Sequence, residues 1–194
     1  MRDLIKEFVQ LCAKQLPLAE PIVEFGSLQV RGQVGYADLR PLFPAKCYLG
    51  ADVREGPGVD VHLDLHKITL DDASVGTVLV METLEHVEFP RQAMAEVFRI
   101  LKPQGTLVLS TCFAFPIHEH PKDYWRFSPQ GVESLLQAYP WSLVESVGSP
   151  KMPHAIVGIA LKMRPDPAVA QSLRPAVTAW KRRWETAPPR RGKR

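Results

Sequence analysis

The sequence has few cysteines, and those present are poorly placed for cross-linking. Among 194 residues there are only Cys12, Cys47 and Cys112. This odd number, at long spacings, does not form a disulfide framework, and no pair has the short spacing of a zinc-ligand motif. We therefore expect reduced thiols and a cytoplasmic protein.

Long apolar runs are also missing. No stretch approaches the roughly 18 apolar residues of a membrane span, and the charges spaced through residues 1–14 do not fit a secretory signal. Hydrophobic residues make up 45% of the chain and charged residues 23%, values typical of a globular protein that buries an ordinary core. We expect one domain over residues 1–165, followed by a C-terminal helix and basic tail over residues 166–194.

Excess charge of one sign is confined to the C-terminus. The net charge is +3, but residues 181–194 alone carry seven basic residues and one acidic residue. The remainder of the chain is mildly acidic and gives no reason to expect nucleic-acid binding. The tail could contact a phosphate surface, although a solvated, frayed terminus is the simpler interpretation.

Short apolar runs that stop at turn residues alternate with helical stripes. The runs predict strands at 21–25, 45–52, 59–64, 75–81, 106–110, 141–147 and 155–163. The stripes predict helices ending before Pro17 and at 90–101, 129–138 and 167–184, the last interrupted by Pro175, with a short helix within 36–43. This alternation indicates an α/β fold with a parallel sheet. The last two strands follow one another without a helix, which favours an antiparallel pair at one sheet edge.

Chemistry-bearing residues follow four of the predicted strands. Ligands of open α/β sheets bind beyond the carboxyl ends of the strands. Gly26, after the first strand, lets the backbone approach a ligand closely. Carboxylates at Asp52 and Asp64 could accept hydrogen bonds from ribose hydroxyls and from an adenine amino group. The fourth strand changes abruptly from apolar to polar at Glu82. An acid after a strand is also a common helix cap, so each feature alone is weak.

Taken in order, these segments resemble class I S-adenosylmethionine-dependent methyltransferases, with a small, methyltransferase type 11-like domain. The resemblance covers about residues 20–163 and is carried by the motifs at 23–27, 49–52, 78–87 and 99–107. Its most specific part is Leu84-Glu85-His86, followed by a helix and by a Leu-Lys-Pro-x-Gly turn.

The resemblance implies a fold and a cofactor. The fold is Rossmann-like and doubly wound, with a mostly parallel seven-stranded sheet, one antiparallel edge strand and helices on both faces. The cofactor is S-adenosyl-L-methionine. The implied cofactor-binding residues are Glu24, Gly26, Ser27, Asp52, Val53, Asp64, Leu65 and Met81. By the same resemblance, Glu24 and Gly26 meet the methionine moiety, Asp52 the ribose, and Asp64 and Leu65 the adenine.

The first glycine loop departs from the family pattern. Ser27-Leu28-Gln29 follows Gly26, where relatives carry a second and third glycine, and the next glycines are Gly32 and Gly35. The loop also lacks the G-x-G-x-x-G that places a pyrophosphate on a helix N-terminus, which disfavours a nicotinamide dehydrogenase.

An aromatic segment after the fifth predicted strand, residues 113–127, is the expected substrate wall or lid. His118 and His120 have the intrinsic pKa of a general base. By resemblance, Glu82 borders the methyl group beside Met81, and we include it among the candidate catalytic residues. Glu85 and His86 are alternatives if they face the cleft. The predicted substrate-binding residues are His86, Tyr124, Trp125 and Arg126.

Metal binding is weakly indicated and is not expected. His118 and His120 with Asp123 have ligand chemistry, but their spacing alone gives little support. Tyr124 and Trp125 could instead plug the core, and His86 could simply bond the backbone.

The sequence does not identify the methyl acceptor. No Asn-Pro-Pro-Tyr-like or Asp-Pro-Pro-Tyr-like motif is present, so methylation of nucleic-acid bases or of glutamine is disfavoured. The leading hypothesis is a methyltransferase acting on a small molecule. A non-catalytic methyltransferase-like binding domain, and an RNA methyltransferase that uses the basic tail, stay open.

Overall fold

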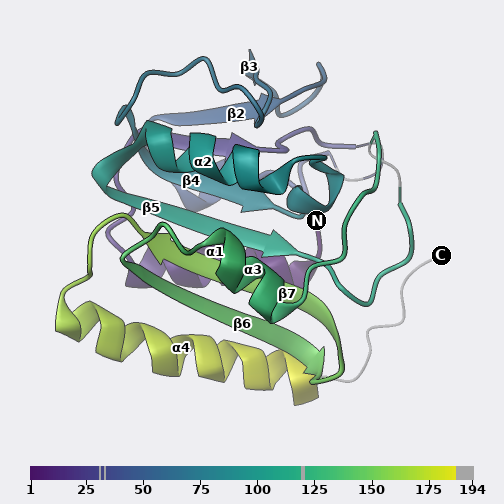
Figure 1. The fold of residues 1–194 in the computed structure, drawn as a ribbon, viewed down its shortest axis with the longest axis vertical. Helices are drawn as coiled ribbons and strands as arrows, with labels where there is room; N and C mark the ends of the chain where they lie inside the picture. Colours follow the sequence, from purple (N-terminus) through teal and green to yellow (C-terminus); the bar gives the residue numbers. More distant parts are fainter. Residues whose placement is uncertain (31, 33, 119–120, 187–194) are drawn as a thin grey trace.

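A computed structural model describes residues 1–30, 32, 34–118 and 121–186. One sheet of seven strands forms the centre, in the order β3-β2-β1-β4-β5-β7-β6 (Figure 1). The strands are β1 (Ile22–Phe25), β2 (Tyr48–Asp52), β3 (Val61–His62), β4 (Val75–Met81), β5 (Leu101–Thr111), β6 (Trp141–Ser149) and β7 (Met152–Leu161).

The first five strands run parallel, and the last two form an antiparallel hairpin. Consecutive strands joined by a tight turn must pair antiparallel. β7 is antiparallel to both β5 and β6, so the reversed strand lies one place inside the edge, which β6 forms. The predicted doubly wound, mostly parallel α/β sheet is confirmed, with its antiparallel strand one place inside the edge where it was expected.

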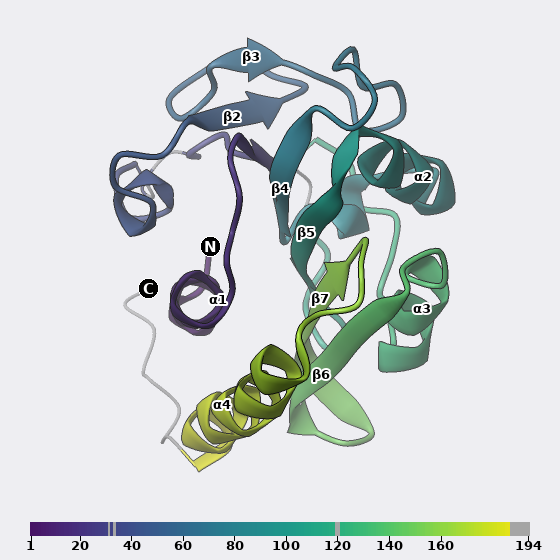
Figure 2. The same ribbon diagram turned by 90° about the vertical axis from the view of Figure 1, so that its left-hand side faces the viewer.

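Helices cover both faces of the sheet (Figure 2). α1 (Asp3–Gln15) and α4 (Pro167–Thr186) lie on one face, and α2 (Pro90–Ile100) and α3 (Pro129–Leu135) on the other. Among the described residues, the connections from β1 to β4 contain no α-helix and only the 3₁₀ turn η1 (Arg40–Leu42). These connections leave the carboxyl ends of β1 and β2 bordered by loops rather than by α-helices.

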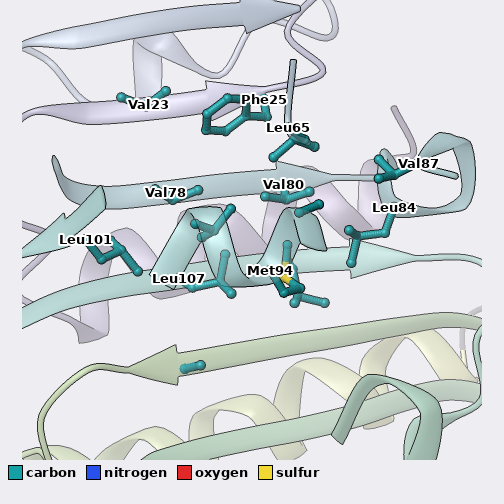
Figure 3. Close-up of a cluster of buried hydrophobic side chains, with 14 of the residues drawn as sticks. Val23, Phe25, Leu65, Val78, Val80, Leu84, Val87, Met94, Leu101 and Leu107 are labelled. Carbon is teal, nitrogen blue, oxygen red and sulfur yellow. The ribbon is translucent and has the colours of Figure 1, made fainter. Parts of the chain in front are cut away.

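Strand β4 is the centre of the core, and all seven of its residues are buried. Its side chains alternate between the faces. Val78 and Val80 pack beneath α2 with Leu107 (Figure 3), whereas Leu79 and Met81 pack toward α1. Burial on both faces explains why this strand appears in the sequence as a continuous apolar run rather than an alternating one.

Several predicted elements have other bounds in the structure, and packing explains two of these differences. β5 begins at Leu101 instead of residue 106, because Leu101 pairs with Val75 across a bulge before the regular register starts. α4 continues through Pro175 and ends at Thr186. The missing amide of Pro175 costs one hydrogen bond, but Trp180 beyond it is anchored against Phe8, with 5.0 Å between ring centroids.

The C-terminal helix is part of the same folded body as the sheet. α4 buries Leu173, Val177 and Trp180 against the cluster that also contains α1 and the edge of β6. Among the described residues, no helix has both the length and the apolar character needed to cross a membrane. Residues 187–194 of the expected basic tail lie outside the described part of the chain.

Candidate functional site

One pocket, about 290 Å³ in volume, opens at the carboxyl ends of β1, β2 and β4. β1 lies between β2 and β4, so the strand order reverses here, where ligands of doubly wound sheets bind. All eight residues expected from the resemblance to contact the cofactor line it: Glu24, Gly26, Ser27, Asp52, Val53, Asp64, Leu65 and Met81. The three expected acceptor-side residues Glu82, His86 and His118 line it as well.

Gly26 and Ser27 form the floor of this pocket. Gly26 has φ +79°, and a Cβ there would lie 2.1 Å from Thr83 Oγ1, so the turn requires glycine. The hydroxyl of Ser27 is buried and has no hydrogen-bond partner among the described residues. A buried, unpaired hydroxyl is costly without a ligand. This orphaned donor and the close glycine turn fit a polar cofactor lying across the floor.

Asp52 lies at the end of β2 and is 5% exposed. Its Oδ1 accepts hydrogen bonds from the backbone and Nε of Arg54, at 2.9 and 3.1 Å. Its Oδ2 accepts a long bond of 3.4 Å from the Leu28 amide. An ionised carboxylate offers about four acceptor positions, so Asp52 retains the capacity to accept from a vicinal diol.

Glu24, at the end of β1, is 4% exposed. Burial raises the pKa of this carboxyl to about 7, while a hydrogen bond from the Tyr48 hydroxyl, at 2.5 Å, and the nearby Arg40 oppose the shift. In its ionised form, Glu24 gives this end of the pocket a negative charge, which suits an ammonium group.

Glu82 is held by an arginine from the start of the chain. Arg2 Nε donates to Glu82 Oε1 at 2.7 Å, across 80 positions in sequence, and Arg2 Nη1 donates to the carbonyl of His154 at 2.9 Å. Glu82 has φ +50°, and its amide donates to the Ser110 carbonyl at 2.9 Å. Met1 and Arg2 therefore line the pocket. Sequence reasoning missed both, because no local pattern marks a contact made across the whole sheet.

His66 is another pocket residue that sequence reasoning missed. The Phe89 amide donates to His66 Nε2 at 3.1 Å, which assigns the proton to Nδ1. Nδ1 lies 2.7 Å from Asp64 Oδ1 and donates to it. His66 thus orients the Asp64 carboxylate. Because the two residues are only two positions apart, the Asp-x-His spacing in the sequence could have indicated this contact.

The aromatic segment lies over the pocket, but its predicted contacts divide into two groups. Phe115 and His118 line the pocket, whereas Tyr124, Trp125 and Arg126, all within the described part of the chain, do not. Trp125 Nε1 donates to the backbone carbonyl of Val87, which follows β4, at 2.9 Å. His120 lies outside the described residues. The substrate-binding role of Tyr124, Trp125 and Arg126 stays a prediction.

Arg126 shapes this segment. Its guanidinium binds both oxygens of Asp123, at 2.5 and 2.8 Å, and donates to the carbonyls of Phe115 and Pro116 at 3.0 and 2.9 Å. The pairing with Arg126 holds the pKa of Asp123 well below its usual range. This fork-to-fork ion pair fixes the loop that carries His118 to the pocket wall.

Comparison with known proteins gives a family match in the middle of the chain. Residues 46–109 match the model of a methyltransferase domain. An uncharacterized 37.1 kDa protein in a transposon of Streptomyces fradiae is 43% identical over 54 residues, 27% of this chain and 16% of that protein. A probable S-adenosylmethionine-dependent methyltransferase of Mycolicibacterium smegmatis is 39% identical over 56 residues, 28% of this chain and 22% of that protein. The chain thus matches less than a quarter of the length of either relative.

Solved structures show the same fold over nearly the whole of their chains. A possible histamine N-methyltransferase of Thermotoga maritima has 20% identity and a TM-score of 0.58, covering 82% of this chain and 92% of that one. An S-adenosylmethionine-dependent methyltransferase of Archaeoglobus fulgidus has 13% identity and a TM-score of 0.61, covering 80% and 94%. The chain therefore has the fold of these S-adenosylmethionine-dependent methyltransferases, and the stretch that matches the methyltransferase-domain model lies within that fold.

Proposed function

We propose that this protein is an S-adenosylmethionine-dependent methyltransferase that acts on a small-molecule acceptor. The observation that carries the proposal is the pocket floor. The required glycine turn at Gly26 and the buried, unpaired hydroxyl of Ser27 lie in one pocket with the Asp52 carboxylate. The matched methyltransferase domain supports the same cofactor.

The chain's own residues fit the parts of this cofactor in order along the pocket. Ionised Glu24 suits the methionine ammonium group, and Asp52 suits the ribose hydroxyls. Asp64, held by His66, lies with Leu65 where the adenine would bind. When bound, the cofactor supplies an electrophilic methyl group on a sulfonium. The task of the protein is then to align the acceptor with that methyl, and orientation of this kind can supply several of the roughly 7–11 kcal/mol available.

The proposed acceptor side of the pocket carries aromatic side chains. Phe115, His86 and His118 border it, and Arg2 lies over the Phe115 ring at 5.4 Å from its centroid. A pocket of about 290 Å³ falls near the lower end of small-molecule sites. These features favour a small acceptor that enters beside the two imidazoles.

An RNA acceptor held by the basic tail is less well supported. Two of the basic residues near the C-terminus are paired within the fold. Lys181 binds Glu145 at 2.8 Å, and Arg183 pairs with Glu7. Paired charges release fewer counterions on binding a phosphate backbone, so they contribute less to RNA affinity.

The three thiols form no disulfide among the described residues, and we propose that the protein works in the reducing cytoplasm.

Calorimetry with S-adenosylhomocysteine, and separately with S-adenosylmethionine, tests the cofactor site. The native protein should bind at least one of them with micromolar affinity. Asp52→Asn keeps the shape of the side chain and removes its charge, so we expect binding about 10–100-fold weaker, as for loss of a hydrogen bond to a charged group.

The matched control is Asp71→Asn, an exposed acid outside the pocket lining. It should bind like the native protein. Equal affinity in Asp52→Asn and native protein would refute the ribose assignment. Absence of binding to either ligand would refute the cofactor proposal and leave a non-catalytic relative.

A further inference from the structure

Three side chains of metal-ligand chemistry meet beside the pocket. Glu85 and His86 come from the 3₁₀ turn η2 (Leu84–His86), which follows β4, and His118 comes from the segment after β5. One ligand atom from each lies within 4.8 Å of the others. Glu85 is fully buried, and the two histidines are half-buried in the pocket wall. Two loops far apart in sequence therefore bring an N, N, O donor set together.

Both imidazoles are oriented through Nδ1. His86 Nδ1 lies 2.5 Å from the Lys122 carbonyl. His118 Nδ1 lies 3.1 Å from the Pro116 carbonyl and 3.2 Å from Asp123 Oδ2. A carbonyl or carboxylate oxygen only accepts, so each Nδ1 carries a proton and donates it. In the neutral ring the lone pair is then on Nε2, so this nitrogen can bind a metal ion while Nδ1–H holds the ring in place.

Behind His118, on the side away from the pocket, Asp123 and Arg126 form a chain of contacts. Asp123, which accepts from the His118 amide at 2.7 Å, is itself clamped by Arg126. The imidazole, its carboxylate acceptor and the guanidinium behind it form a chain of oriented groups. Such outer partners fix a ligand's tautomer and ring angle and keep it poised for a metal.

The buried carboxyl supplies an independent observation. Glu85 is 0% exposed, and its Oε2 accepts from Thr111 Oγ1 at 2.9 Å. Its Oε1 is buried without a hydrogen-bond partner among the described residues, although the Cys112 thiol lies close to the carboxyl. An unpaired buried oxygen of this kind is costly. A cation beside it would remove that cost.

We propose that Glu85, His86 and His118 bind one divalent transition-metal ion at the wall of the pocket. Two imidazoles and one carboxylate suit Zn²⁺ and its neighbours rather than Mg²⁺ or Ca²⁺, which prefer all-oxygen shells. Three protein ligands leave a coordination position open, as in catalytic zinc sites. This set differs from the His118, His120 and Asp123 group that the sequence suggested, because Asp123 lies behind His118 as the acceptor of its proton.

A function for the ion follows if the methyltransferase proposal holds. A hydroxyl of the acceptor would occupy the open position, and coordination would lower the pKa of that hydroxyl, as it does for zinc-bound water. The hydroxyl proton leaves to solvent, and the oxygen forms a bond to the methyl carbon. The carbon–sulfur bond breaks with its electron pair passing to sulfur, which gives a methyl ether and S-adenosylhomocysteine. The ion itself is unchanged.

The test measures metal binding directly, without cofactor or acceptor, so its result is independent of the proposed activity. Protein stripped with a chelator is titrated with Zn²⁺ by calorimetry and with Co²⁺ by visible absorption. We expect one equivalent of Zn²⁺ with micromolar or tighter affinity, and ligand-field bands from Co²⁺ without a thiolate charge-transfer band. His118→Asn, in the exposed segment, and Glu85→Gln should each weaken binding about 100-fold.

Two control variants separate this site from adventitious binding. His62→Asn removes an exposed imidazole of β3 that is outside the pocket lining, and Cys47→Ser removes the exposed thiol. Both should bind Zn²⁺ like the native protein. Circular dichroism tests whether each variant is folded. If Glu85→Gln does not fold, the Zn²⁺ affinity of His118→Asn alone tests the proposal. Zn²⁺ affinity unchanged in His118→Asn, or lost in Cys47→Ser, would overturn the proposal, as would the absence of any bound equivalent.

Discussion

Glu24 is a carboxyl whose protonation depends on where the chain places it. It is buried at the end of β1 with the Tyr48 hydroxyl as hydrogen-bond donor. Arg40 and the N-terminal amine of Met1 lie near enough to favour the ionised form, and Asp38 opposes it. Burial outweighs these charges and raises the pKa to about 7, so the group titrates near neutral pH.

This shift predicts a pH-dependent stability. The folded state binds more protons than the unfolded state between the ordinary pKa of a glutamate and about 7. The free energy of unfolding should therefore fall as pH rises through this window, by up to about 3 kcal/mol. Glu24→Gln keeps the acceptor for Tyr48 and removes the titration. Urea denaturation of both proteins from pH 4.5 to 8 should show the native protein losing stability relative to the variant; parallel curves would contradict the shift.

At the same scale, the sequence shows which residues can be predicted. Asp52 and Asp64 were identified because each follows an apolar run, and strand ends converge in any parallel sheet. Arg2 was not, because its contact with Glu82 spans 80 positions and depends on where α1 starts against the sheet. Arg126 was placed in the substrate site on its residue type, whereas the structure engages its guanidinium with Asp123 and loop carbonyls.

Among the elements, α4 depends most on tertiary packing. Trp180 is 4% exposed, packs against Phe8 and donates to the Leu4 carbonyl at 3.2 Å. Trp180→Ala should lower the free energy of unfolding by about 3–5 kcal/mol, the usual cost of removing a buried tryptophan. Trp184→Ala is the control in the same helix, because that ring is only half-buried. It should cost clearly less in the same denaturation experiment, and equal losses would show that Trp180 is not the anchor.

Element positions were predictable where one physical signal dominated. The limits of β4 were predicted correctly at 75–81, because continuous burial leaves an unbroken apolar run. The start of β5 was placed late, because Pro103 and Gly105 look like a turn, whereas pairing of Leu101 with Val75 extends the strand past them. The path of α4 through Pro175 was also beyond sequence reasoning, because packing against α1 offsets the missing hydrogen bond.

At the scale of the whole molecule, the pocket joins parts that are distant in sequence. Its walls come from the N-terminus, the ends of β1, β2 and β4, and the segment after β5. A ligand bound there contacts both halves of the sheet on either side of the switch point. Such a ligand binds only the folded state, because unfolding separates every one of these walls, and it must therefore stabilise the fold as a whole.

The size of this stabilisation can be predicted. S-adenosylhomocysteine at 100 times its Kd should add about 2.7 kcal/mol, which for a chain of this length raises Tm by about 5–11 °C. At the same concentration, Asp52→Asn with tenfold weaker affinity should gain about half as much, because the gain grows with the logarithm of occupancy. Differential scanning fluorimetry measures both. A shift that is equal in the two proteins would mean that the ligand stabilises the fold from somewhere other than the Asp52 end of the pocket.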